Sequence, residues 1–394
     1  MFPLKDTGDW TEADLESRWP ERKFLPPGHQ QLSFDIEECF MKSIPSQFEA
    51  SQKAMKMLRE KYPGRKIIQV SEGMYSGSLP ITRGAKGLKP DGTLGIGIIP
   101  LSPTCIDTAP FGPGILPDTS AEGRTKHKVM DEEIHEAFFG SAETTWLNIF
   151  EDLGCENITG RALDAGYTYP DRFLQMCTPG VEYPRTDAPS SNGFAGGLPK
   201  GHRDPMKEPP KWWEEVVKNP GKKDIVFVCQ GNVARNLSDL TFSTMEALKD
   251  RENTLVVVAL GLKGATFPKG THVPSNVRVA DLIPFDECLP HCAVFVTNGG
   301  YGAVQHGISN RIPLVVAGAG EDKPEVCVRA EWAGVAVNLR TDQPTKEAPR
   351  EAIDEVISNS KYKKATRKLK AEMATLDPMT VTTKTIDELV AGKS

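Results

Sequence analysis

Residues 293–324 constrain the fold of this chain more than any other stretch. An apolar strand is predicted at residues 293–297, a helix at residues 301–309 and a second apolar strand at residues 314–317, with a glycine-containing turn after each strand. Two strand–turn–helix steps in succession are typical of a parallel sheet. Because ligands bind such sheets in the crevice at the carboxyl ends of the strands, the stretch predicts a binding site there.

The two turns carry different chemistry. Gly299 and Gly300 let a ligand approach the main chain, and the helix that follows offers unpaired N–H groups and a partial positive charge to an anion such as phosphate. Glu321 and Asp322 in the second turn can accept hydrogen bonds from sugar hydroxyls. Together the turns predict a nucleotide-sugar site. The alternative is that the glycines only permit a tight turn between strand and helix.

The bulk properties favour an enzyme of small-molecule chemistry. A chain of 394 residues can form two domains of ordinary size. Its net charge of -6 gives no positive field that would recruit nucleic acid. The sequence has no apolar run long enough for a transmembrane helix or a signal peptide, so a cytoplasmic protein is expected. Its 8 cysteines are too sparse for a disulfide framework.

The second half of the chain alternates strands and helices regularly. Its near-continuous Val, Ile and Leu runs are typical of strands buried on both faces. We therefore expect a complete doubly wound domain at residues 211–376, followed by a helical tail at residues 377–394. Six strands are predicted in this half, at residues 224–229, 254–260, 277–282, 293–297, 314–317 and 335–339.

The first half, residues 1–180, offers only three strand candidates. A loop rich in Pro, Thr and Gly at residues 102–119 follows the second of them and can shape an acceptor pocket. Residues 181–210 are dense in Pro, Gly and Ser and are predicted to be the interdomain linker. The predicted strands are residues 66–70, 94–101 and 173–177, and helices are predicted at residues 37–62 and 129–153.

The run from Val279 to Leu339 resembles the donor-binding signature of the family 1 glycosyltransferases. The segments VTNGGYG, PLVVAG and EDKPEV carry the resemblance, which is greatest to the bacterial and fungal branch acting on natural products and extends through most of the chain. It implies the α/β GT-B fold, with two Rossmann-like domains facing a cleft. The first domain would bind the acceptor, the second the donor, and the helical tail would cross back to the first.

The same resemblance implies that the first domain is incomplete at its start. In this family the chain opens with a strand, a Gly-rich turn carrying the catalytic histidine, a helix and a second strand, and that opening is absent here. About 50 residues are missing from the pattern, roughly the size of one βαβ unit. Either the true start lies upstream, or the protein is a shortened variant.

The resemblance also assigns a donor site. Main-chain N–H groups from residue 298 to residue 300 would stabilise the leaving diphosphate in place of a divalent metal, so no metal or other cofactor is expected. The turn at Gly231 would add further N–H groups, and residues 282–285 would contact the nucleobase. The donor-binding residues expected are Gly231, Asn232, Ile283, Phe285, Asn298, Gly299, Gly300, Tyr301, Gly302, Glu321, Asp322 and Lys323.

Three positions depart from the family pattern. Asn298 stands where many relatives have a histidine, so an amide would contact the phosphate. Lys323 replaces a glutamine and cannot accept a hydrogen bond, which suggests a sugar other than plain glucose. His306 replaces the ribose-binding acid of the plant enzymes, although a packed or solvated side chain is the commoner role for such a histidine. The usual stacking tryptophan is missing, so uracil, thymine and guanine all stay open.

The catalytic base is the least defined part of the site. Glu72 aligns with the family's acid that orients the missing histidine, and it could act alone if burial raised its pKa. His29 and His127 could approach the cleft, but neither sits in a supporting motif and both are expected at the surface. Cys288, His291 and Cys292 are spaced loosely like metal ligands, yet a structural zinc site needs four.

These observations together predict an inverting glycosyltransferase. It would move a sugar from a UDP- or dTDP-sugar to a hydroxyl of a small lipophilic acceptor, such as a secondary metabolite. The alternative is a catalytically inactive donor-binding homologue or partner subunit that lacks the base. A sugar-nucleotide epimerase of the same architecture fits the motif less well. The basic run at residues 361–370 is expected to be a solvated helix face and not a nucleic-acid site.

Overall fold

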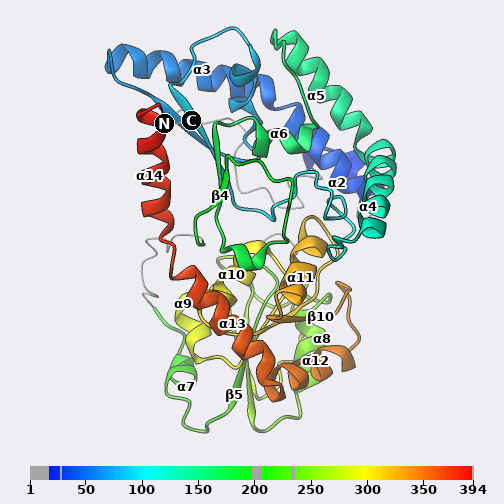
Figure 1. Ribbon diagram of the computed structural model, residues 1–394. Helices are drawn as coiled ribbons and strands as arrows, with labels where there is room; N and C mark the ends of the chain where they lie inside the picture. The colour runs from blue at the N-terminus through cyan, green and yellow to red at the C-terminus, as the bar shows by residue number, and fades with distance from the viewer. Residues whose placement is uncertain (1–16, 27–28, 198–205, 207, 232–235, 393–394) are drawn as a thin grey trace. The chain divides into compact units, whose positions relative to one another are not determined.

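The computed structural model describes residues 17–26, 29–197, 206, 208–231 and 236–392. The chain divides into two compact units, one of Met1–Leu198 with Leu376–Ser394 and one of Pro199–Thr375. Each unit contains one parallel sheet with helices around it (Figure 1). In the part of the chain that is described, no helix is both long and apolar enough to cross a bilayer.

The sheet of the second unit has the doubly wound strand order. Its strands lie in the order β10-β9-β8-β5-β6-β7, and all of them are parallel. The order reverses between β5 and β8, which makes their carboxyl ends the topological switch point. All six predicted strands are present: β5 Asp224–Cys229, β6 Thr254–Ala259, β7 Val277–Ala280, β8 Val294–Thr297, β9 Leu314–Val316 and β10 Ala336–Asn338.

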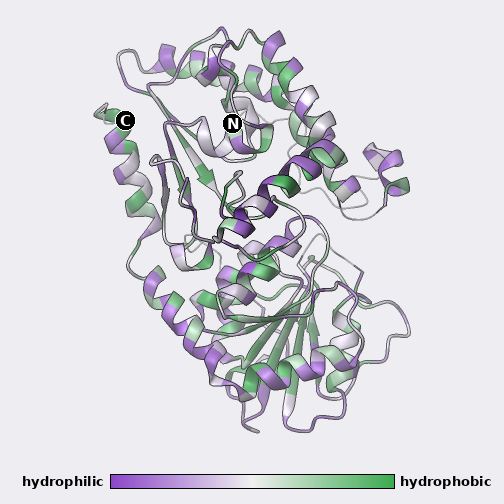
Figure 2. Cartoon of the chain, turned by 45° about the vertical axis from the view of Figure 1, so that its right-hand side comes forward, coloured by the Kyte–Doolittle hydropathy of each residue, from purple (hydrophilic) through white to green (hydrophobic). Residues whose placement is uncertain are grey.

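Both faces of this sheet are covered by helices, and its central strands are mostly apolar (Figure 2). On one face Val226 and Val296 pack in a cluster with residues of α8 and α12. Phe227 and Phe295 point to the other face, where Phe285 packs on both rings. The helices of this unit are α7 Trp213–Val217, α8 Thr241–Leu248, α9 Phe285–Cys288, η7 Leu289–His291, α10 Tyr301–Ser309, α11 Lys323–Trp332, α12 Glu347–Ser358 and α13 Ser360–Met373.

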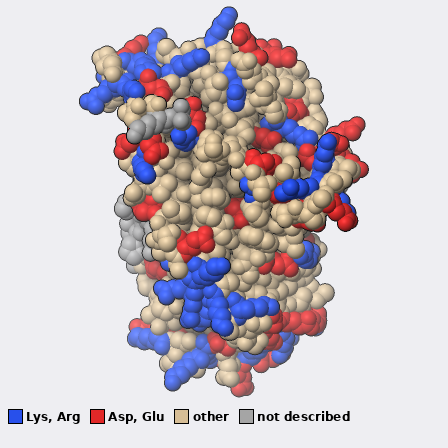
Figure 3. All heavy atoms as spheres, in the orientation of Figure 1, with Lys and Arg blue, Asp and Glu red and all other residues tan. Residues whose placement is uncertain are grey.

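Helix α13 explains the basic run. Tyr362, Thr366 and Leu369 form its buried side. The lysines and arginines lie on the opposite side, where Figure 3 shows them gathered over this helix. The run is therefore the solvated face of an amphipathic helix.

The first unit has a four-stranded parallel sheet in the order β1-β2-β3-β4. The strands are β1 Ile68–Glu72, β2 Gly92–Gly97, β3 Arg172–Gln175 and β4 Asn192–Phe194. Strand β4 lies inside the stretch expected to be the linker, and it pairs with β3 from Phe173↔Asn192 to Gln175↔Phe194. The expectation differs from the structure because Pro, Gly and Ser mark the turns that flank so short a strand.

Aromatic side chains form the core beside this sheet. Trp146 and Phe150 are fully buried, with ring centroids 4.7 Å apart. The helix expected at residues 129–153 starts earlier, as α4, and continues through a π-helical segment, η5, into α5. The helices are η1 Pro20–Phe24, α2 His29–Asp35, η2 Ile36–Met41, α3 Ile44–Lys61, η3 Ser76–Ser78, η4 Pro80–Arg83, α4 Ala121–Ile134, η5 His135–Phe139, α5 Gly140–Asp152, α6 Ala162–Thr168 and η6 Pro179–Val181.

The last helix, α14 Pro378–Val390, belongs to the first unit although it ends the described chain. Its Leu389 is buried in a cluster with Leu94 of β2, and Ile68 of β1 packs against the same cluster. The Lys66 Nζ also donates a hydrogen bond to the Val390 carbonyl at 2.6 Å. The helix therefore completes the core of a sheet built from the first 200 residues.

Candidate functional site

The predicted phosphate turn lies at the switch point of the second sheet. Strand β8 ends at Thr297 and is followed by Asn298, while β5 ends at Cys229 and is followed by Gln230 and Gly231. Gly231 has a φ of +83°, and a Cβ placed on it would lie 3.8 Å from the Asn298 amide group. The two turns therefore lie close together. Asn232, the other residue expected in the β5 turn, lies outside the described residues.

Gly299 and Gly300 differ in how much space there would be for a side chain. Gly299 has a φ of +82°, and a Cβ there would lie 2.3 Å from the Cys327 Sγ, so packing alone requires glycine. Gly300 has an ordinary φ of -59°. The nearest atom to a Cβ on Gly300 would be the Asn298 Oδ1, 3.9 Å away. The tight-turn explanation thus accounts for Gly299 but not for Gly300, whose missing side chain leaves open space.

The start of α10 offers main-chain donors beside this space. Gly300 is the N-cap residue, and no side chain caps the helix. The Val304 N–H makes the first bond, to the Gly300 carbonyl, so the N–H groups of Gly302 and Ala303 have no acceptor within the helix. Tyr301 is buried at the first helical position. An anion is the natural partner of such a helix start.

The acidic turn after β9 packs against the phosphate turn. A Cβ on Gly318 would lie 2.1 Å from the Asn298 carbonyl oxygen and 2.7 Å from the Lys323 Cβ. Lys323 is buried and forms an ion pair with Glu321, so the lysine that replaces the family's glutamine holds a neighbouring acid. Burial raises the pKa of Asp322, an effect that Lys323 partly offsets. The two turns therefore form one continuous edge.

The residues expected to contact the nucleobase lie at α9. Ile283 is buried, and the Phe285 ring packs edge-on against Phe227 and Phe295 of the sheet. The Phe285 ring also lies 5.3 Å from the His306 imidazole. Phe285 is thus first a core residue, with only part of its surface exposed.

An acid that the sequence analysis did not select lies beside His306. The His306 Nδ1 is 3.0 Å from the Asp286 Oδ1, and the Asn310 amide donates to the same oxygen at 2.8 Å. A carboxylate therefore stands next to the position where the plant enzymes have their ribose-binding acid. The signal that could have found it is its place directly after Phe285, in the segment already assigned to the nucleobase.

Glu72 is the last residue of β1. Its Oε2 accepts a hydrogen bond from the Met74 N–H at 3.0 Å, whereas its Oε1 is buried without a partner among the described residues. Burial raises the pKa of Glu72, as a general base would require.

The surface position expected for His127 is wrong. The side chain is 5 % exposed, and its Nδ1 has no partner in the described part of the chain. His127 is one of two buried residues on α4, and the rest of that helix is exposed or half-buried. The side chain of His29 lies outside what the structure describes.

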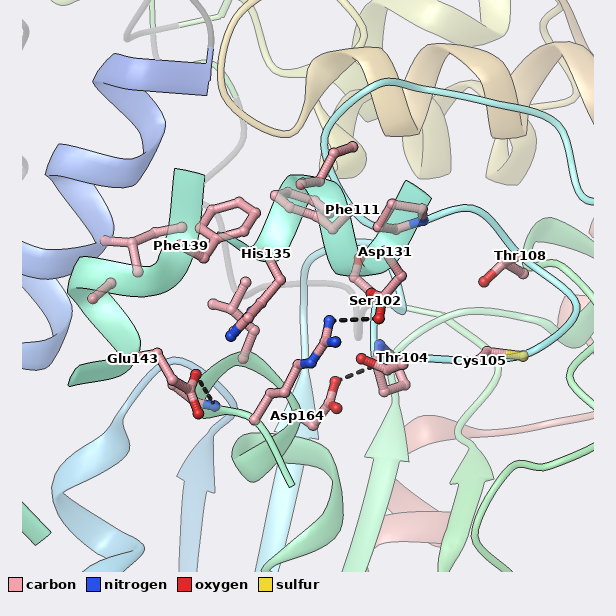
Figure 4. A pocket seen from close by; sticks show the side chains of 18 residues that line it. Ser102, Thr104, Cys105, Thr108, Phe111, Asp131, His135, Phe139, Glu143 and Asp164 are labelled. Atoms are coloured by element: carbon pink, nitrogen blue, oxygen red, sulfur yellow. Dashed lines mark hydrogen bonds and ion pairs between the residues drawn. The ribbon is translucent and has the colours of Figure 1, made fainter. Parts of the chain in front are cut away.

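The first unit contains a pocket that the sequence analysis located only by its loop (Figure 4). Its walls come from the loop after β2, from the helix running through α4, η5 and α5, and from the start of α6. The apolar part includes Phe111 and Phe139. Three acids, one histidine and one arginine also line it: Asp131, Glu143, Asp164, His135 and Arg161.

Main-chain and ion-pair contacts fix the three acids of this pocket. Asp131 lies 2.6 Å from the Arg161 guanidinium. The Glu143 Oε2 accepts a hydrogen bond from the Ala162 N–H at 2.9 Å, and the Asp164 Oδ1 accepts one from the Thr104 N–H at 2.7 Å. Burial raises the pKa of both Glu143 and Asp164. Sequence reasoning missed these acids because they come from three separate segments.

Two groups of residues resemble metal ligands. Cys105, Asp107 and Asp187 place their ligand atoms within 4.8 Å of one another. Hydrogen bonding accounts for Asp107, because its Oδ1 accepts from Arg124 and its Oδ2 from Thr186. Cys288 and Cys292 are buried with their Sγ atoms 3.7 Å apart, whereas His291 is exposed.

Comparison with known proteins shows which proteins this chain is related to. Residues 244–389 match the family described as "Erythromycin biosynthesis protein CIII-like, C-terminal domain". The chain is 36% identical over 391 residues to UDP-glucosyltransferase A1 of Starmerella bombicola, an alignment that covers 99% of this chain and 82% of the relative.

Solved structures agree on the fold. The glycosyltransferase of kitacinnamycin superposes with a TM-score of 0.65 at 18% identity, covering 89% of this chain and 83% of the other. Spinosyn rhamnosyltransferase SpnG, solved with thymidine diphosphate, superposes with a TM-score of 0.60 at 14% identity, covering 95% and 83%. Strand order, sequence similarity and superposition thus agree, and the chain belongs to the UDP-glycosyltransferase-like family of GT-B glycosyltransferases of the natural-product type.

Proposed function

We propose that this glycosyltransferase moves a sugar from a UDP- or dTDP-sugar to a hydroxyl group of a small lipophilic acceptor, with inversion at the anomeric carbon. The name of the Starmerella relative supports a uridine nucleotide, and the thymidine diphosphate in SpnG supports the dTDP alternative. Inversion would follow from in-line attack by the acceptor oxygen opposite the departing diphosphate.

The observation that carries the proposal is the open space at Gly300. It lies at the switch point, beside the Asn298 amide and the uncapped start of α10, and no packing contact among the described residues requires a glycine there. Main-chain N–H groups fixed in this position would stabilise the diphosphate without reorganising during the reaction. The sugar would lie along the adjoining turn, where Glu321 and Asp322 can accept its hydroxyl hydrogens.

Glu72 is our proposed base. An acceptor hydroxyl must lose its proton as it attacks, and the buried, unpartnered Glu72 Oε1 is an acceptor with no competing hydrogen bond among the described residues. We propose that the acceptor binds in the pocket of the same unit, between the loop after β2 and the helix of η5.

The test is a turnover assay on the full chain. UDP- and dTDP-sugars are offered with a library of hydroxylated aromatic acceptors, and release of the nucleoside diphosphate is followed. We expect acceptor-dependent release with at least one donor, and product whose anomeric configuration is opposite to that of the donor. Donor binding without release from any pair would contradict the proposal and favour an inactive homologue.

A further inference from the structure

The pocket of the first unit holds more negative charge than its contacts neutralise. The Arg161 guanidinium pairs with Asp131, at 2.6 Å. Among the described residues, neither Glu143 nor Asp164 has a Lys or Arg within ion-pair distance, and Arg161 acts on both carboxyl groups only from farther away. The lining therefore has three carboxyl groups, those of Asp131, Glu143 and Asp164, against the single guanidinium of Arg161.

The geometry leaves part of this charge accessible. The Ala162 N–H occupies the Glu143 Oε2, and the Glu143 Oε1 has no hydrogen-bond partner in the described part of the chain. Figure 4 shows the Phe111 and Phe139 rings above the carboxylates of Glu143 and Asp164 in that view. An occupant would thus meet aromatic surface on one side and fixed carboxylates on the other.

We propose that this pocket selects acceptors in which an apolar body carries a protonated amine, bound by the Glu143 carboxylate. The inference rests on the proposed function, in which the pocket is the acceptor site. An ammonium group supplies three hydrogen-bond donors and no acceptor, which suits carboxylates, whereas an anionic ligand would be repelled. Asp164 adds to the attraction, and the hydroxyl that receives the sugar lies elsewhere on the acceptor.

The test compares three probes with one skeleton: 3-phenylpropylamine, 3-phenylpropan-1-ol and 3-phenylpropanoate. Their binding to the full chain is measured by calorimetry at pH 7 and low salt, without donor. We expect the amine to bind most tightly and the carboxylate most weakly, with about a tenfold span, because one charge contact of roughly 1 kcal/mol changes affinity about fivefold. Equal affinities, a preference for the carboxylate, or no binding of any probe would overturn the proposal.

Substitutions in the pocket test whether Glu143 causes the preference for amines. Glu143→Gln should reduce amine affinity about fivefold and leave alcohol affinity unchanged. Glu133→Gln, a change on the exposed side of α4 outside the pocket, should alter neither. Asp164→Asn keeps an oxygen for the Thr104 N–H and should reduce amine affinity in the same direction. An amine preference that survives both pocket changes would refute the assignment.

The binding experiment and the turnover assay test different statements, and either can fail without the other. Turnover with hydroxylated acceptors but no amine preference would contradict only the inference that the pocket selects amines. An amine preference without turnover from any donor would support the pocket assignment and contradict the proposed function.

Discussion

At the scale of single residues, Gly299 and Gly300 are neighbours with different reasons for being glycine. A Cβ on Gly299 would lie 2.3 Å from the Cys327 Sγ, and the backbone there is left-handed. The nearest atom of the described residues to a Cβ on Gly300 would be the Asn298 Oδ1, at 3.9 Å. The first glycine is therefore required by the fold, and the second is available to a ligand.

Alanine substitutions should separate these roles. Gly299→Ala should lower the free energy of unfolding by about 1–3 kcal/mol because the residue is both strained and overpacked. Gly300→Ala should leave stability within about 0.5 kcal/mol and weaken binding of the nucleoside diphosphate. Urea denaturation and calorimetry check the two effects. Unchanged diphosphate affinity in Gly300→Ala would place the ligand elsewhere.

The proposed role of Glu72 as the base predicts how the reaction rate depends on pH. A base must be deprotonated, and burial raises the Glu72 pKa above its ordinary value of 4.5. The rate should therefore rise with pH through a midpoint higher than that value. Glu72→Gln should reduce kcat about 10²–10⁴-fold and remove this limb of the profile, while donor affinity stays unchanged.

A matched control for this experiment is Glu60→Gln, at an exposed position on α3. It should leave both the rate and the pH profile as they are. Near-normal kcat in Glu72→Gln would show that another group takes the proton.

At the scale of elements, the loop after β2 depends on a single acid. The Asp107 side chain is fully buried, accepting hydrogen bonds from Arg124 of α4 through one oxygen and from Thr186 through the other. These bonds, those from Thr186 first, lower the Asp107 pKa. A group with a lowered pKa stabilises the fold above its unfolded value, near 3.9, and the contribution is lost as pH falls through the folded value.

Asp107→Asn should therefore destabilise the protein at pH 7 by about 1–3 kcal/mol, because an amide cannot accept on both sides. The difference from the unchanged protein should shrink as pH falls below about 4, where the unfolded chain takes up the proton first, and disappear once pH is below the lowered pKa of folded Asp107. Thermal unfolding across this range provides the measurement. Asp152→Asn, exposed on α5, is the control, and a pH-independent difference would argue against the ionised state of Asp107.

Helix α14 should contribute directly to the stability of the first unit. Leu389 is 4% exposed and packs with Leu94, so Leu389→Ala should cost about 2–4 kcal/mol. Met379 on the same helix is 60% exposed, and Met379→Ala should cost less than about 0.5 kcal/mol. Equal effects in chemical denaturation would mean that the helix does not form part of that core.

At the scale of the whole molecule, the sequence predicts what depends on continuous apolar runs. All six strands of the second sheet were recognisable, because a strand such as β6 is buried at every position and is apolar after its first residue, Thr254. Strand β4 was not, since its three residues, Asn192 to Phe194, have the composition of a loop. The position of the turn at residues 298–300, between β8 and α10, was predictable because its residues are consecutive. Glu143 and Asp164 were not, because only the tertiary fold brings them to the pocket.

The two units differ in the number of chain segments that form them. The second is one uninterrupted segment, whereas the first takes its closing helix, α14, from the far end of the sequence. The cluster around Ile68 and Leu94 is completed by Leu389 of α14, so the chain must pass through the second unit before this cluster can form. The core of the first unit therefore depends on a helix that is made only after the whole second unit has been translated.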